Sequence, residues 1–148
     1  MRNRITIPSD FSYLKDVEIF IQELLEGAHV SEFISGYINL CICESVSNAI
    51  YHGNNQDLKK NVTIFAECKD EFLIVEVRDE GKGFDYINLP DPTLSENLRK
   101  EGGRGLFIIR NLVDQLVFKN NGSVIQLTFK LNSEHQFLLR RRHSSSSG

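Results

Sequence analysis

Apolar residues recur along this chain at two spacings, one of three to four residues and one of two, and the two alternate in blocks. The helical spacing predicts a helix over residues 10–26, with Ser9 as its N-cap and Gly27 as its end. It predicts a longer helix from a Ser31 cap to His52, where Gly53 stops it. The inward arc of the longer helix is expected to hold Ile34, Ile38, Cys41, Ser45 and Ala49.

The spacing of two residues predicts five short strands, over residues 4–7, 62–68, 71–78, 116–118 and 124–131. Lys69-Asp70 and Asn120-Asn121-Gly122 are turn-forming connections, so each is expected to join an antiparallel hairpin. Residues 54–60 read as a loop. Between the hairpins, apolar residues at helical spacing predict a third helix, with a stripe made by Leu106, Ile109, Leu112, Val113 and Leu116.

Composition narrows the class of protein. The 148 residues are 41% hydrophobic and 25% charged, which predicts one folded domain over residues 1–132 and a disordered tail over 133–148. A net charge of -3 gives no general attraction for nucleic acid or for a membrane surface. Three cysteines without metal-site spacing are expected to be reduced thiols, and no apolar run is long enough to span a membrane, so we expect a cytoplasmic protein.

The stretch Asp79-Glu80-Gly81-Lys82-Gly83-Phe84 carries the first candidate chemistry. Alternation in the preceding strand places Asp79 on the same face as Leu73, Val75 and Val77. A carboxylate on an apolar face needs hydrogen-bond donors, and two nearby glycines allow a close backbone approach. A flat ligand edge with an amino donor, such as adenine, meets both conditions. A solvated hairpin turn is the alternative interpretation.

Glu44 and Asn48 form the second candidate group, one turn apart on the flank of the predicted long helix. At the rim of a core, the Asn48 amide oxygen could bind Mg²⁺ and the Glu44 carboxylate could act as a base for an attacking hydroxyl or water. His52 lies one turn further along, where a role at the helix end is the alternative to ligand binding. For Glu44 and Asn48 the alternative is an ordinary solvated face.

Residues 85–101 are long and irregular enough to suggest a lid over a ligand. They are followed by Gly102-Gly103-Arg104-Gly105-Leu106, at the expected start of the third helix. Free N–H groups and the helix dipole make such a start suitable for phosphate, although glycines also occur there for packing.

Together and in this order, the three motifs resemble the N box, G1 box and G2 box of the ATPase superfamily shared by gyrase, heat-shock chaperones and histidine kinases. The E-x-x-x-N-A-x-x-H-G form, from Glu44 to Gly53, is most similar to the bacterial anti-sigma factor serine kinases. The resemblance covers about residues 4–131. It implies an α+β two-layer sandwich, with a mixed, mainly antiparallel sheet backed by helices, that binds ATP with Mg²⁺ under a mobile lid.

The resemblance also implies residue roles. Glu44 would be the catalytic base, Asn48 would hold Mg²⁺, and Asp79 would accept a hydrogen bond from the adenine amino group. The nucleotide-binding residues would be Asn48, His52, Asp79, Gly81, Gly83, Phe84, Gly102, Gly103, Arg104, Gly105 and Leu106.

Proteins of the resembled family phosphorylate a small anti-anti-sigma protein on serine or threonine and, as homodimers, hold a sigma factor inactive. Partner binding there often uses an arginine of the first helix, whereas the corresponding helix here offers only Lys15. Two alternatives to this kinase remain. One is a non-catalytic binding module that ATP switches, and the other is a detached catalytic domain of another phosphorelay.

Overall fold

The computed structural model describes residues 2–82, 109 and 112–131 of the chain. Its elements, in chain order, are β1 Arg2–Pro8, the 3-10 turn η1 Phe11–Tyr13, α1 Leu14–Glu26, α2 Glu32–Asn48, the π-helical turn η2 Ala49–Gly53, β2 Asn61–Lys69, β3 Phe72–Arg78, β4 Gln115–Lys119, the 3-10 turn η3 Asn120–Gly122 and β5 Val124–Lys130. The predicted lid, the tail over 133–148 and most of the predicted third helix lie outside the described residues.

The strands form one five-stranded sheet in the order β1-β2-β3-β5-β4. Every pairing among them is antiparallel, so the parallel component of the expected mixed sheet is not found in the part of the chain that the structure describes. Both predicted hairpins are present. Asp70 adopts a left-handed backbone conformation, with φ of 56°, at the tight turn between β2 and β3.

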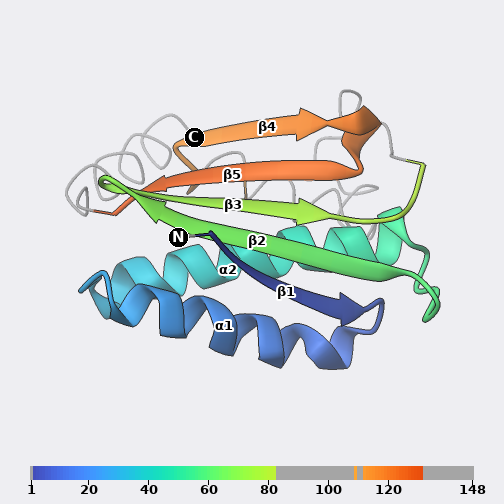
Figure 1. Ribbon diagram of the computed structural model, residues 1–148, viewed down its shortest axis with the longest axis horizontal. Helices are drawn as coiled ribbons and strands as arrows, with labels where there is room; N and C mark the ends of the chain where they lie inside the picture. Colours follow the sequence, from blue (N-terminus) through green and yellow to red (C-terminus); the bar gives the residue numbers. More distant parts are fainter. Residues whose placement is uncertain (1, 83–108, 110–111, 132–148) are drawn as a thin grey trace, which may run out of the picture.

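Helices α1 and α2 lie together over one face of this sheet, which makes a two-layer sandwich (Figure 1). The alternation of β3 sends Leu73, Val75 and Val77 into the space between the layers. From α2, the predicted inward arc is buried throughout, including Ile34, Ile38 and Cys41 at 1% exposure or less. The expected α+β sandwich is therefore confirmed. The other face of the sheet has no described helix over it.

The Ser31 cap is confirmed, because its hydroxyl accepts a hydrogen bond from Ile34 N at 3.2 Å. The predicted Ser9 cap is wrong. Asp10 instead caps the first turn by accepting from Ser12 N, while the Ser9 hydroxyl donates to Lys60 O at 2.6 Å. The end of β1 lies against the loop that leads into β2, and this long-range contact takes the hydroxyl away from the helix.

The three cysteines, Cys41, Cys43 and Cys68, are free, in agreement with reduced thiols. In the described part of the chain, no helix combines the length and the apolar character needed to cross a membrane.

Phe129 is fully buried between the layers, and its removal tests the core. We expect Phe129→Ala to lower the free energy of unfolding by about 3–5 kcal/mol, since it deletes a large buried ring and leaves a cavity. Phe72→Ala is the matched control, because Phe72 lies on β3 with 37% of its surface exposed, and it should cost less than about 1 kcal/mol. Urea denaturation of both variants gives the two values. Equal losses would contradict this account of the core.

Candidate functional site

Asp79 follows the last residue of β3 and is held by its backbone and by its side chain. Its N–H donates to Ser123 O at 2.9 Å, and its Oδ1 accepts from Gly81 N at 2.8 Å. Burial raises the pKa of the Asp79 carboxyl to about 6, although the Gly81 hydrogen bond and the charge of Lys60 oppose this. The Asp79 carboxylate is therefore partly desolvated, which is unfavourable for its charge, as the sequence predicts.

Two glycines let the chain close around this carboxylate. A Cβ atom on Gly53, at the end of η2, would overlap the Asp79 carboxylate, and one on Gly81 would overlap the Gly53 carbonyl oxygen. Glycine is thus required at position 81, where the contact is with backbone, and a side chain at position 53 would displace the Asp79 carboxylate. The Cβ position of Gly81 faces Gly53, so this glycine allows a close approach within the chain, and its predicted approach to a ligand stays a prediction.

Asn54 holds the same region together, and sequence reasoning missed it. Its side chain is fully buried, and Nδ2 donates to Ser9 Oγ and to Asn61 O, both at 2.9 Å. Its Oδ1 accepts from Glu80 N at 2.8 Å. The Glu80 carboxylate in turn accepts from Asn61 N. The amide therefore positions the turn that carries Asp79.

The sequence holds little signal for this role of Asn54. It stands in the polar run NNQD directly after a helix, where asparagine is a common turn residue. Only the hydrogen-bond partners, which lie 45 residues before Asn54 and 26 residues after it, distinguish it from its neighbour Asn55.

Asn48, at the end of α2, is 3% exposed, so it is buried, and the alternative of an ordinary solvated face does not hold for this residue. Its Nδ2 is buried and has no hydrogen-bond partner among the described residues. A buried amide with an unmet hydrogen-bonding atom is costly unless a ligand completes it. The two atoms of an amide are assigned from their surroundings, so either nitrogen or oxygen can face the ligand.

Glu44 lies one turn before Asn48 on α2 and is partly exposed. Burial raises the pKa of Cys41 to about 12 and that of Cys43 to about 11, and nearby negative charges add to the shift, from Glu44 at Cys41 and from Glu18 and then Glu44 at Cys43. These two thiols are therefore poor nucleophiles at neutral pH.

His52 lies within η2 and not on a continuous α-helix. Asn54 N donates to Ala49 O, five residues earlier, which is the hydrogen bond of a π-helical turn. The wider turn means that His52 does not follow Asn48 at the predicted α-helical spacing. The imidazole instead packs edge-on against the Tyr51 ring, with centroids 4.8 Å apart.

The structure thus brings Asp79, Gly81 and Gly53 into contact, with Asn48 and Glu44 on the helix that leads to Gly53. Their roles toward a ligand stay predictions. Gly83, Phe84, Gly102, Gly103, Arg104, Gly105 and Leu106 lie outside the described residues.

A metal in this region would need ligands other than a cluster of His, Cys, Asp or Glu side chains of the described residues. Among the described residues, no group of three or more His, Cys, Asp or Glu side chains could hold a metal ion. Mg²⁺ commonly binds through one or two protein oxygens together with water and substrate phosphates, so Asn48 alone on the protein side is compatible with it.

The sequence is similar to those of curated serine-protein kinases, and the fold is similar to that of a solved structure. The chain is 25% identical over 138 residues to the serine-protein kinase RsbW of a bovine strain of Staphylococcus aureus, with 86% of each chain covered. It is 24% identical over 136 residues to the same kinase of strain Newman, again with 86% of each covered. The structure of the RsbU and RsbW domains of Rv1364c from Mycobacterium tuberculosis matches with a TM-score of 0.62 and 21% identity. That match covers 88% of this chain and 32% of the other.

A protein-family model also matches the sequence of this chain. The model described as the histidine kinase-like ATPase domain matches residues 7–129, from the end of β1 into β5. That range includes both helices and every candidate residue named above. The chain therefore belongs to the histidine kinase-like ATPase domain family.

Proposed function

We propose that this protein is an ATP-dependent serine/threonine protein kinase of the anti-sigma factor type. The observation that carries the proposal is the partly buried Asp79 carboxylate, held against the end of the helix that also bears Glu44 and Asn48. Family membership and relatives named serine-protein kinases support the reading.

The residues around Asp79 fit the adenine end of ATP. The carboxylate has one oxygen bonded to Gly81 N, which leaves acceptor capacity for the adenine amino group. Burial strengthens that hydrogen bond because water competes less for the carboxylate. Gly83 and Phe84 would border the base, and His52 would lie near the sugar and phosphates.

The unmet amide of Asn48 fits a metal-bound phosphate chain. In the proposed complex the amide oxygen binds Mg²⁺, which neutralises charge on the phosphates. The phosphates themselves would be held by the segment Gly102, Gly103, Arg104, Gly105 and Leu106.

Glu44 is the proposed general base. Its carboxylate is accessible and lies one helical turn from Asn48, so a hydroxyl brought to the metal-bound phosphate would come within its reach. Glu44 would accept the proton of a partner's serine or threonine as the hydroxyl attacks.

The proposed substrate is a small anti-anti-sigma protein, and the proposed binding partner is a sigma factor held by a homodimer in a bacterial cytoplasm. Within α1 the only basic residue is Lys15, which is exposed. A lysine provides a point charge and not a planar fork of donors, so sigma-factor binding would depend on other contacts as well.

Replacing Glu44 tests the proposed base. We expect Glu44→Gln to keep ATP affinity and to lower phosphate transfer by about 10²–10⁴-fold, the usual contribution of a general base. The assay follows label from γ-labelled ATP into serine or threonine of proteins in a lysate of the organism that encodes the chain. Glu32→Gln, in the first turn of the same helix, is the matched control and should transfer normally. Equal transfer by wild type and Glu44→Gln would refute the mechanism. ATP binding without any transfer would favour the ATP-switched binding module.

Replacing Asp79 tests the adenine contact. In Asp79→Asn the amide loses the charge and half of the acceptor capacity, so we expect ATP affinity to fall at least about tenfold. Asp70→Asn is the control, since Asn tolerates the left-handed conformation of that turn. Titration calorimetry measures the ATP affinity of both variants. An unchanged ATP affinity of Asp79→Asn would show that Asp79 does not make the adenine contact.

The raised pKa of Asp79 predicts a pH dependence of binding. With a pKa of about 6, the carboxyl is charged at pH 7.5 and gains a proton as the pH falls below 6. The protonated group donates where the adenine amino group needs an acceptor. Adenosine affinity should therefore fall by up to about tenfold per pH unit below 6, and adenosine avoids the titration of the phosphates. A constant affinity between pH 7.5 and 5 would contradict the assignment.

A further inference from the structure

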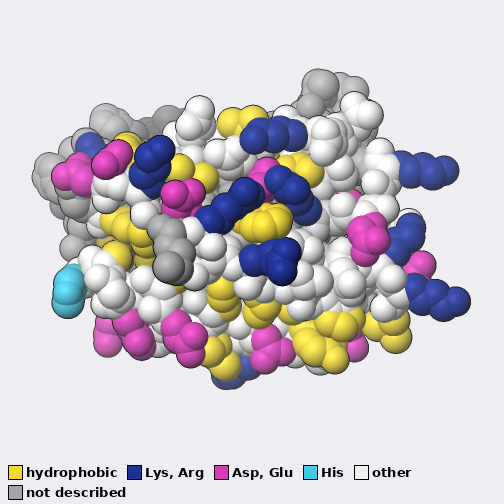
Figure 2. All heavy atoms as spheres, viewed as in Figure 1, with side chains coloured by type: hydrophobic (Ala, Val, Ile, Leu, Met, Phe, Trp, Pro, Cys, Tyr) yellow, Lys and Arg dark blue, Asp and Glu magenta, His cyan; other side chains and the backbone are white. Residues whose placement is uncertain are grey.

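The face of the sheet opposite the helices has its own charge character, independent of the proposed function. Paired residues of neighbouring strands point to the same face of the sheet, and alternate residues along a strand do so too. On the face that holds Glu76, six of the residues are basic, namely Arg2, Arg4, Lys69, Arg78, Lys119 and Lys130. We call these six residues the cationic sheet face. Two acidic residues, Glu67 and Glu76, share it, which leaves a formal excess of four positive charges in a chain whose net charge is -3. Figure 2 shows several Lys and Arg side chains close together over the middle of the molecule.

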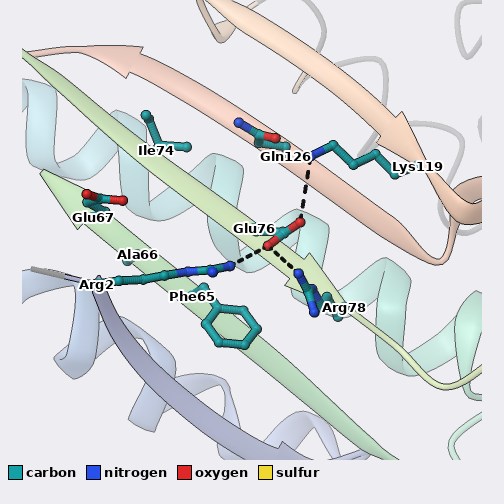
Figure 3. Close-up of a pocket in the computed structure, with 9 residues that line it drawn as sticks. All are labelled: Arg2, Phe65, Ala66, Glu67, Ile74, Glu76, Arg78, Lys119 and Gln126. Carbon is teal, nitrogen blue, oxygen red and sulfur yellow. Dashed lines mark hydrogen bonds and ion pairs between the residues drawn. The ribbon is translucent and has the colours of Figure 1, made fainter. Parts of the chain in front are cut away.

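A hollow of about 350 Å³ lies within the cationic sheet face, above β2, β3 and β5. Figure 3 shows Arg2, Arg78 and Lys119 directed toward the single carboxylate of Glu76 from three different strands. Arg2 Nη2 and Arg78 Nη2 lie 2.7 and 3.0 Å from Glu76 Oε2, and Lys119 Nζ lies 3.9 Å from Oε1. Phe65 and Ile74 supply apolar lining.

The charges in this hollow are not balanced. The Glu76 side chain is only 11% exposed, whereas the side chains of the three cations are 46–50% exposed. Each of the two guanidinium groups carries five donors and gives one hydrogen bond to Glu76, and about half of each arginine side chain is exposed. Glu76 therefore orients the cations and leaves capacity for further acceptors.

Phe65 restricts what can bind. The guanidinium carbons of Arg2 and Arg78 lie 4.0 and 4.8 Å from the centre of its ring. The ring is thus engaged by the two arginines, and it does not offer the free aromatic surface on which a nucleic-acid base would stack. The same contacts hold both guanidinium planes in place, so less side-chain entropy is lost when a partner binds.

We propose that the cationic sheet face docks an acidic segment of a partner protein, whose carboxylates bind Arg2, Arg78 and Lys119 around the apolar floor of the hollow. Charge complementarity favours this partner, since complementary potentials promote encounter and fix orientation. A second copy paired through the same face would bring two excesses of positive charge together. Arg78 immediately precedes Asp79, so the docked segment would lie against the same strand that ends at the candidate site, on its opposite face.

The test uses the full chain and a short fluorescein-labelled peptide in which Glu alternates with Ser, followed by fluorescence anisotropy. We expect binding at low salt that weakens toward about 0.15 M salt. We expect Lys119→Gln and Arg4→Gln each to weaken binding by about two- to fivefold, as for exposed ion pairs. Both residues are exposed or half exposed, and Glu76 keeps both arginines in each variant, so the fold should be retained.

Lys15→Gln, an identical loss of charge on α1, is the matched control and should bind the peptide as wild type does. An equal effect of Lys15→Gln and Lys119→Gln would overturn the proposal, as would the absence of binding or equal binding of a peptide with Gln in place of Glu. Tighter binding of single-stranded DNA or of phosphatidylserine vesicles at this face would overturn it in favour of another class of ligand. Self-association that Lys119→Gln abolishes, measured by sedimentation, would assign the face to a second copy.

Discussion

The buried amide of Asn54 makes three hydrogen bonds that join segments far apart in the chain: it donates to Ser9 after β1 and to Asn61 at the start of β2, and accepts from Glu80 after β3. Because a buried amide is costly when any of its partners is missing, the network is satisfied only when all three segments are in place. It thereby couples the formation of the sheet to the position of the Asp79 turn. The contact of Gly53 and Gly81 depends on this arrangement, since both lie beside Asn54 or Glu80.

Strand β3 separates two kinds of chemistry by its alternation. Leu73, Val75 and Val77 face the helices and lead to Asp79, whose burial raises its pKa. Glu76 and Arg78 face the other way and belong to a surface where positive charge exceeds negative. The same two-residue period therefore supplies a desolvated acceptor on one side and solvent-facing donors on the other. A protein with a small overall negative charge can in this way present a basic surface.

Much of the fold followed from local pattern. The five strands, the two hairpin turns, the Ser31 cap and the inward arc of α2 all depend on periodicity or on turn chemistry, which act over a few residues. The expectations that were wrong involve competition from distant groups. The Ser9 hydroxyl donates to Lys60 O and therefore does not cap the first helix. The π-helical turn at Ala49–Gly53 replaces the last predicted α-helical turn, directly before Asn54 and its hydrogen-bond network.

The sequence by itself determined the family, because three short motifs in one order carry that information without any contact between them. It also determined which residue types are available to bind adenine, to bind a metal ion and to accept a proton. Only the tertiary structure decided that Asn48 is buried with an unmet amide, that Gly53 and Gly81 pack against each other beside Asp79, and that Asn54 differs from Asn55. The physical reason is that burial and hydrogen-bond pairing are properties of residues distant in sequence, which no local period encodes. The cationic sheet face has the same origin, since its six basic residues come from strands β1 to β5 and meet only when the sheet forms.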